Sequence, residues 1–414
     1  METLDHYRPI LFLVRIDIDS SILLYNTVTG GIVCLNGDDD IVNSLHQLIE
    51  MHFYVPNDFD EISWIDKQRQ INAEKESKTL DGYTILTTLD CNAKCFYCYE
   101  KGQPRISMSE KTAIDIVDFI AKNANRNVVQ DIRWFGGEPL LNEKVIDIIC
   151  EKLTEKGIKF QSRMISNGLL FDEYNISKAK KSWNLKKVQI TLDGTENVYR
   201  KAKSYINATG DEFQKVLNNI ESLLKSKVRV VIRLNQDLYN SDDLLQLVEL
   251  LSKRFKNMSG LTVYNSLLFT EEEEMNLSRY ESFLKLQDSI FAYDLQNYKD
   301  IRKHIKVRHC MADNDSSIII GPTGKIGKCE HYPNEFLIGS IYENGYDIEM
   351  INKWKETFEV KEKCRTCPLY PHCVRIKMCP EERENCTFIQ CENKIELIKK
   401  TRLQRYNSFK QPKG

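Results

Sequence analysis

Three cysteines lie close together in the segment CNAKCFYCYE, where Cys91, Cys95 and Cys98 are separated by three and then two residues. A short loop with three thiolates can hold three irons of a cubane iron–sulfur cluster and leave the fourth iron open. Structural zinc, by contrast, is usually held by four protein ligands. The spacing therefore favours a catalytic cluster whose open iron binds a substrate or cofactor, with a structural zinc site as the alternative.

A second, larger group of cysteines occupies the last quarter of the chain. Eight of the 13 cysteines lie between residues 310 and 391, enough to ligate two further cubane clusters completely. So many cysteines are unusual in a reduced compartment unless most of them bind metal or perform redox chemistry. Zinc ribbons are the alternative for the paired cysteines. Cys34 and Cys150 stand apart in apolar patterns and are predicted to be core residues.

Glycines and polar residues follow several of the predicted strands. In WFGGEPLL, Gly136 and Gly137 allow a close approach of the backbone, and the Glu138 carboxylate can form a charge-assisted hydrogen bond to an ammonium group. Residues after the carboxyl ends of parallel barrel strands line active sites, so such residues face a reaction chamber or close a turn. The other residues in these positions are Ser166, Asn167, Asp193, Arg233 and Asn235.

From about residue 82, apolar strands alternate with amphipathic helices, which predicts βαβ units and a parallel sheet. Short strands followed by an Asp-rich helical stretch predict a small α+β module before it. A charged helical stretch leads into the cysteine-rich tail, whose packing is expected to depend on metal. The six expected strands are 83–89, 131–137, 159–166, 186–194, 229–235 and 261–269, with helices such as 110–124, 143–157 and 213–227 between them.

Composition and charge point away from nucleic acid and membranes. The 58 Lys and Arg residues nearly balance the 60 Asp and Glu residues, so no overall field favours either partner. The apolar run near the start is short and is broken by Arg15 and Asp17, and no stretch reaches the roughly 18 apolar residues of a spanning helix. We therefore expect a soluble, cytoplasmic protein.

The CxxxCxxC loop, its place after the first barrel strand and the GGE element together resemble the radical S-adenosylmethionine (SAM) family. The cysteines from Cys310 through GPTGKIGKC and CRTCPLYPHC resemble its SPASM branch. The resemblance implies an α/β fold in which a partial (β/α)6 TIM-like barrel carries a small N-terminal α+β module and a C-terminal iron–sulfur domain. The expected boundaries are 1–80 for the module, 81–276 for the barrel, 277–309 for a helical bridge and 310–414 for the SPASM domain.

By the same resemblance the cofactors are SAM and three [4Fe-4S] clusters, one of them held by Cys91, Cys95 and Cys98. Residues that would contact SAM are Tyr97 near the adenine, Gly136, Gly137 and Glu138 at the methionyl ammonium, Ser166 and Asn167 at the ribose or carboxylate, Arg200 at the carboxylate, and Asp193 at the chamber. The first auxiliary cluster would take Cys310, Cys329 and Cys379, and the distal one Cys364, Cys367, Cys373 and Cys391.

Two features leave the ligand partition open. The interval from Cys373 to Cys379 is longer than the family's usual three intervening residues, which puts Cys379 in doubt. Cys386 is left as the fourth ligand of the first auxiliary cluster, a substitute for Cys391 or a bystander.

Glu330, directly after Cys329, is the predicted catalytic base, because related maturases carry an acidic residue there that deprotonates substrate. A glutamate on a solvated strand is the alternative. His331 and His372 are lesser candidates, since a lone His is usually structural or solvated.

The resemblance implies a peptide maturase. A flavodoxin or ferredoxin would reduce the first cluster, and SAM cleavage would yield a 5'-deoxyadenosyl radical that takes hydrogen from a ribosomally made precursor peptide. Loss of an electron to an auxiliary cluster would then close a thioether or carbon–carbon crosslink. The N-terminal module would bind the peptide's leader as an added strand or act as a structural cap. The alternatives are an anaerobic sulfatase-maturating, formylglycine-forming enzyme and a non-catalytic iron–sulfur electron-transfer or peptide-binding protein.

Overall fold

The chain divides into two compact units, each assembled from distant parts of the sequence. The module unit comprises Met1–Glu76, Tyr298–Cys310 and Lys355–Gly414, and the sheet unit comprises Ser77–Asn297 and Met311–Trp354. The computed structural model describes residues 4–76, 79–237, 239–256, 258–268, 277–295, 305, 307–308, 310–331, 336–380, 395–396, 398–400, 402–403 and 406.

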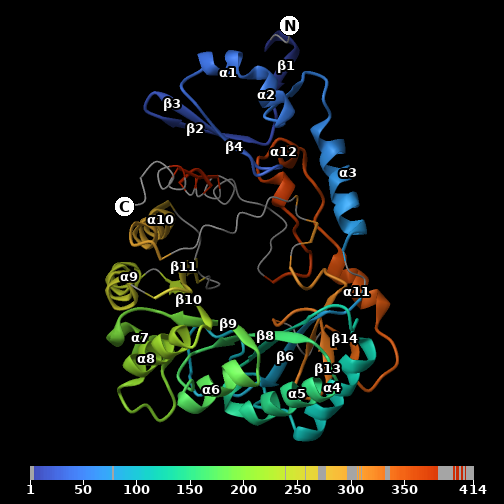
Figure 1. Cartoon of the computed structure of the whole chain (residues 1–414), viewed down its shortest axis with the longest axis vertical. Helices are drawn as coiled ribbons and strands as arrows, with labels where there is room; N and C mark the ends of the chain where they lie inside the picture. The colour runs from blue at the N-terminus through green and yellow to red at the C-terminus, as the bar shows by residue number, and fades with distance from the viewer. Residues whose placement is uncertain are drawn as a thin grey trace. The chain divides into compact units, whose positions relative to one another are not determined.

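Six parallel strands form the core of the sheet unit, which confirms the predicted α/β class (Figure 1). Burial alternates along several of them, with Ile132, Ile190 and Ile232 fully buried on one face. Their neighbours on the other face are half-buried polar residues, namely Arg133, Gln189 and Arg233. The strands are β6 (Gly82–Thr88), β7 (Gln130–Gly136), β8 (Phe160–Ser166), β9 (Leu185–Leu192), β10 (Arg229–Gln236) and β11 (Leu261–Leu267).

The sheet continues beyond β6, the first of the six predicted strands. Strand β12 (Ser317–Ile320) pairs in parallel with β6, and β13 (Lys325–Gly327) and β14 (Leu337–Ser340) follow as antiparallel strands. The apolar run of β12 is buried, so the SIII segment completes the core of this unit rather than packing apart from it. Strands β12, β13 and β14 are thus part of one nine-stranded sheet with the six parallel strands.

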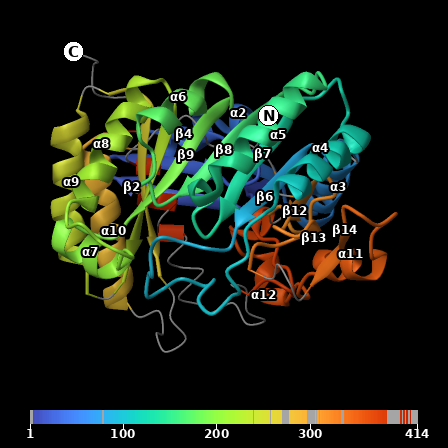
Figure 2. The same ribbon diagram turned by 90° about the horizontal axis from the view of Figure 1, so that it is seen from below.

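Helices follow the parallel strands and cover the outer face of the sheet (Figures 1 and 2). Local sequence sets where they begin: the side chains of Ser109 and Asp172 accept backbone hydrogen bonds at the starts of two of them. The helices are α4 (Glu110–Asn123), η2 (Pro139–Asn142), α5 (Glu143–Glu155), α6 (Glu173–Lys181), α7 (Glu196–Lys203), α8 (Glu212–Lys225), α9 (Ser241–Phe255), α10 (Leu277–Ala292) and α11 (Ile348–Lys355).

The strands and helices predicted for the N-terminal module are present in the module unit. An antiparallel sheet has the order β2-β3-β4, with β2 at Leu13–Ile18, β3 at Ser21–Asn26 and β4 at Ile32–Leu35. A second pair joins β1 (Tyr7–Pro9) to β5 (Tyr54–Pro56). The helices are η1 (Leu4–His6), α1 (Asp39–Asn43), α2 (Leu45–Glu50), α3 (Glu61–Glu74), α12 (Glu362–Arg365) and η3 (Tyr370–His372).

The two isolated cysteines have different environments. Cys150 on α5 is fully buried, as predicted. The prediction of a core position for Cys34 is wrong: its side chain is exposed, and its Sγ lies 3.1 Å from the Tyr406 hydroxyl. Cys34 lies on β4, which pairs with β3 alone among the described strands, so its side chain has a strand neighbour on one side within the sheet. Among the described residues, no helix is long and apolar enough to cross a membrane.

Candidate functional site

The predicted site residues lie where the parallel strands end. Strands β6 to β10 pair in parallel, so their carboxyl ends share one edge of the sheet and the loops that follow converge there. The structure brings these residues together in two groups, Glu138 with Ser166 and Asn167, and Tyr97 with Asp193 and Asn235.

The loop with the three cysteines begins directly after β6 and is fastened on two sides. Asn167 Nδ2, from the end of β8, donates to Asn92 Oδ1 at 2.6 Å. The backbone of the loop also pairs with the end of α7, where Lys94 N donates to the Lys203 carbonyl at 2.9 Å. Loop conformation therefore depends on residues far away in sequence.

The three thiols suit an iron–sulfur cluster in their chemical type, and they share one loop. Cys91, Cys95 and Cys98 are free and half-buried in a single loop. Burial, together with the nearby Glu138 and the other two thiols, raises the pKa of the Cys91 thiol to about 12, and a coordinated metal is what deprotonates such a thiol. No three His, Cys, Asp or Glu side chains within the described ranges are grouped closely enough to hold a metal ion.

The two glycines of the GGE element lie directly against the start of the cysteine loop. Gly137 N donates to the Thr88 carbonyl at 3.1 Å, and Glu138 N donates to the Asp90 carbonyl at 2.9 Å. A Cβ atom at Gly136 would overlap the Thr88 carbonyl oxygen, and one at Gly137 would overlap that of Asp90. Glycine is therefore required here by the close approach of two backbones.

Replacing Gly136 with Ala should lower the free energy of unfolding by about 3 kcal/mol, because the new methyl group meets backbone and the residue has a φ of 123°. Gly157→Ala is the matched control, since Gly157 also has a positive φ of 68° but has nothing within 4 Å of an added Cβ. Its loss should be only about 1 kcal/mol. Equal losses in urea unfolding would show that the contact with Thr88 does not constrain the site.

Glu138 has no exposed surface and is surrounded by hydrogen-bond donors. Its carboxylate accepts from Ser166 Oγ at 2.9 and 3.1 Å, from Asn167 N at 2.8 Å and from Leu140 N at 3.2 Å. Burial raises the pKa of this carboxyl to about 7, although these hydrogen bonds oppose the shift. The carboxylate thus orders the ends of β7 and β8, and a role at the SAM ammonium stays a prediction.

A buried polar network joins the cysteine loop to β9, β10 and α7. The Tyr97 hydroxyl donates to Asp193 Oδ1 at 2.8 Å, and Asn235 Nδ2 donates to the same oxygen at 3.0 Å. Lys203 Nζ lies 3.1 Å from Asp193 Oδ2 and donates to Tyr97 Oη at 2.9 Å and to Thr191 Oγ1 at 2.6 Å. The buried Asn235 Oδ1 has no partner among the described residues, so the network retains an acceptor suited to a polar ligand.

Lys203 is the site residue that sequence reasoning missed. Arg200, predicted to pair with the SAM carboxylate, is exposed on α7 and lies outside this network, and its role toward SAM stays a prediction. Burial lowers the pKa of Lys203, but the Asp193 carboxylate outweighs this and holds it well above its usual value. A signal was present in the sequence, since Lys203 follows the buried Tyr199 by four residues and so lies on the apolar face of the helix.

The segment that contains the predicted base lies against the cysteine loop. The ring of Tyr99, next to Cys98, stacks on His331 with centroids 4.3 Å apart and an angle of 23° between the planes. Burial chiefly raises the pKa of Tyr99, and the neighbouring charges of Glu330 and Cys329 add to the effect. Cys329 and Glu330 are half-buried. The structure therefore places both residues near the loop that carries the three thiols.

The remaining predicted residues have less connection to this edge. Arg233 Nη2 donates to Ser266 Oγ at 3.0 Å on β11. His372, in the module unit, contacts the Thr27 carbonyl. Cys310 and Cys373 are exposed, Cys364, Cys367 and Cys379 are half-buried, and Cys386 and Cys391 lie outside the described residues.

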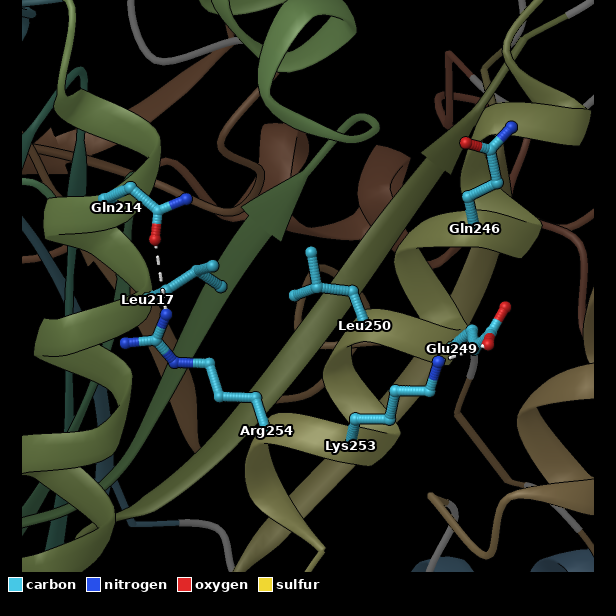
Figure 3. A pocket seen from close by; sticks show the side chains of 7 residues that line it. All are labelled: Gln214, Leu217, Gln246, Glu249, Leu250, Lys253 and Arg254. Atoms are coloured by element: carbon cyan, nitrogen blue, oxygen red, sulfur yellow. Dashed lines mark hydrogen bonds and ion pairs between the residues drawn. The ribbon is translucent and has the colours of Figure 1, made fainter.

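An open groove of about 630 Å³ lies between two outer helices (Figure 3). Gln214 and Leu217 of α8 face Leu250 and Arg254 of α9, and Arg254 Nη1 donates to Gln214 Oε1 at 3.3 Å. None of the predicted site residues lines it. The groove is thus separate from the edge where the loops converge.

Comparison with known proteins identifies the domain. Residues 85–251 match the Radical SAM superfamily. The chain contains a radical SAM domain. These residues begin in β6 and include the cysteine loop, the GGE element, Asp193 and Lys203. A radical SAM domain implies an enzyme that uses SAM and the [4Fe-4S] cluster that binds it.

Two relatives in sequence are named as GTP 3',8-cyclases. GTP 3',8-cyclase of Clostridium perfringens (strain SM101) is 25% identical over 320 residues, which cover 70% of this chain and 96% of the cyclase. The probable GTP 3',8-cyclase of Methanocaldococcus jannaschii is 30% identical over 152 residues, covering 36% of this chain and 48% of that protein.

Two solved structures have a similar fold. The structure of anSMEcpe with bound AdoMet has a TM-score of 0.60 at 19% identity and covers 80% of this chain and 100% of its own. Streptococcus suis SuiB bound to precursor peptide SuiA has a TM-score of 0.53 at 12% identity and covers 89% of this chain and 94% of its own. At these identities the likeness concerns the fold.

Proposed function

We propose that this radical SAM enzyme is a maturase that installs an oxidative crosslink, a thioether or a carbon–carbon bond, in a ribosomally made precursor peptide. The observation that carries the proposal is the stacking of Tyr99 on His331, which brings Cys329 and Glu330 beside the cysteine loop. A cluster ligand and a base near the site of radical formation are what net oxidation of a substrate requires. SuiB with its precursor peptide and anSMEcpe with a Cp18Cys peptide support a peptide substrate.

The chain's own residues would divide the work as follows. Cys91, Cys95 and Cys98 hold the cluster, which when bound and reduced by a flavodoxin or ferredoxin supplies the electron that cleaves SAM to methionine and a hydrogen-abstracting 5'-deoxyadenosyl radical. Glu138, Ser166 and Asn167 keep the ends of β7 and β8 in place beside the loop. The cysteines from residue 310 onward would hold two auxiliary clusters, which would supply an acceptor for the electron that the substrate loses.

Glu330 accepts the proton that the substrate loses in the same oxidation. Glu330→Gln should therefore leave 5'-deoxyadenosine formation within about twofold of the parent enzyme and lower crosslinked product by about 100-fold, the scale of general-base catalysis. Both products can be measured by mass spectrometry in one anaerobic incubation. Glu343→Gln, at an exposed glutamate of the sheet unit, is the control. A normal product yield from Glu330→Gln would return Glu330 to the role of a surface residue.

The module unit supports recognition of a leader peptide at a sheet edge. One face of the β2-β3-β4 sheet packs on a cluster that includes Leu45 and Leu48, and the other packs on Ile395 and Ile398. With both faces covered, a peptide can add only along an edge, and β4 pairs with β3 alone among the described strands. A leader that joins this edge would keep the part of the peptide that is modified bound to the enzyme.

The direct test is anaerobic incubation of the reconstituted enzyme with SAM, dithionite and a candidate precursor peptide, taken from a small open reading frame that neighbours the gene. We expect 5'-deoxyadenosine together with a crosslinked peptide whose mass is lower by that of two hydrogen atoms, about 2 Da. Unaltered peptide despite 5'-deoxyadenosine formation would contradict the proposal. A formylglycine residue in place of a crosslink would support the sulfatase-maturating alternative.

GTP cyclisation is the second candidate function, because the C. perfringens cyclase is similar over 96% of its own length. That similarity leaves about a third of this chain unmatched, since it covers 70% of the chain. The same incubation with GTP in place of peptide distinguishes the two functions. Conversion of GTP would favour the cyclase, and unchanged GTP would favour the maturase.

A further inference from the structure

The loop Cys364–Cys373 is folded as a series of turns in which backbone hydrogen bonds link its three cysteines in sequence. Cys367 N donates to the Cys364 carbonyl at 3.1 Å, Tyr370 N donates to the Cys367 carbonyl at 2.9 Å, and Cys373 N donates to the Tyr370 carbonyl at 3.2 Å. These turns are short and contain no long helix or strand. Their conformation must therefore be held by contacts from outside the loop.

Those contacts come from the N-terminal module, about 300 residues earlier in the chain. Arg69 Nη2, on α3, donates at 2.6 Å to the Tyr370 carbonyl, the same oxygen that accepts from Cys373 N. The Arg69 guanidinium also lies 4.5 Å from the centroid of the Tyr370 ring. Thr27 Oγ1 donates to the Pro368 carbonyl at 2.6 Å, and Thr27 has no exposed surface.

Apolar packing joins the loop to the module in the same place. The Tyr370 ring is 6% exposed and stacks on Phe12 with centroids 6.0 Å apart. It belongs to a buried cluster with Ile10, Val28 and Ile65, against which Cys364 also packs. Side chains of the module thus contact two backbone carbonyls of the loop, the ring of Tyr370 and the side chain of Cys364.

We propose that the N-terminal module is the scaffold of the distal iron–sulfur cluster, with Arg69 and Thr27 as positioning residues for the thiols of the loop. This proposal rests on the proposed function, because that function requires the loop to hold a cluster. Support of this cluster is then a function of the module, either in addition to leader binding or in place of it. Three thiols in a fixed series of turns are a suitable donor set for such a cluster.

The test measures bound iron and sulfide in the full-length protein with Cys91, Cys95 and Cys98 replaced by Ala, so that only auxiliary clusters remain. Arg69→Ala combined with Thr27→Val should lose roughly half of this iron, because one of two clusters is affected. Arg15→Ala is the control, since Arg15 lies in the same module but makes only exposed ion pairs with Asp17 and Asp38. Arg69→Lys should restore part of the iron.

Three outcomes are distinguishable. Unchanged iron in the Arg69 and Thr27 variant would overturn the scaffold role while leaving the clusters in place. A parent protein without auxiliary iron would overturn both the clusters and the inference. Loss of iron in the Arg15→Ala control as well would also overturn it, because the effect would then come from the module's general stability.

The same coupling can be measured from the side of the loop, without a substitution in the module. If the module holds the cluster, the cluster also stabilises the module, since coupling between two sites is mutual. Replacing Cys364 and Cys367 with Ala should therefore speed amide hydrogen exchange in α3 by about 10-fold. Exchange in α4 of the sheet unit serves as the internal reference. Unchanged exchange in α3 would contradict the proposal.

Discussion

Replacing Cys91, Cys95 and Cys98 together with Ala is expected to abolish SAM cleavage while leaving auxiliary iron bound. The reason is chemical: without these thiolates the cluster whose open iron receives SAM has no protein ligands, and no other group of three cysteines has the same spacing. The 5'-deoxyadenosine formed from SAM and dithionite should fall below detection. Bound iron should fall by about a third, since one of three clusters is lost.

Cys34→Ala is the matched control for this experiment, because Cys34 is an exposed cysteine of the module unit. It should keep the full iron content and the full rate of 5'-deoxyadenosine formation. Retained turnover in the triple variant would refute the assignment of the three ligands. A fully reconstituted parent enzyme that yields no 5'-deoxyadenosine would instead refute SAM cleavage itself.

Lys203→Met should be the most destabilising single substitution at the site. It removes the only described cation within ion-pair distance of Asp193 and leaves a carboxylate with 1% exposure in a buried network. Breaking a buried ion pair from one side costs about 3–5 kcal/mol of the free energy of unfolding. Tyr97 would lose its bond to Nζ as well, so the cysteine loop should loosen.

Urea unfolding of the sheet unit, followed by fluorescence of the buried Trp134 and Trp183, measures this loss. Adding Asp193→Asn to Lys203→Met should recover part of the stability, because the uncompensated charge is gone. Lys215→Met is the control, since Lys215 makes an exposed ion pair with Asp211 that contributes at most about 1 kcal/mol. Equal effects of the two lysine substitutions would contradict the buried role of Lys203.

Much of the radical SAM domain could be predicted because its signals are local. The six strands were recognisable from apolar runs between amphipathic helices, and the structure has all six in parallel order. The cysteine loop and the GGE element could be placed at strand ends for the same reason. Cys34 shows where this reasoning fails, since an apolar pattern does not reveal that β4 is an edge strand.

The sequence by itself determined the chemistry of this protein, because thiol spacing and glycine placement are properties of neighbouring residues. Only the tertiary structure decided which partners those residues have. It showed that Gly136 and Gly137 permit the approach of two backbones, that Lys203 is a buried cation beside Asp193, and that α3 contacts the distant loop Cys364–Cys373. Such contacts join residues up to about 300 positions apart, and burial and ion pairing at that range leave no periodic trace in the sequence.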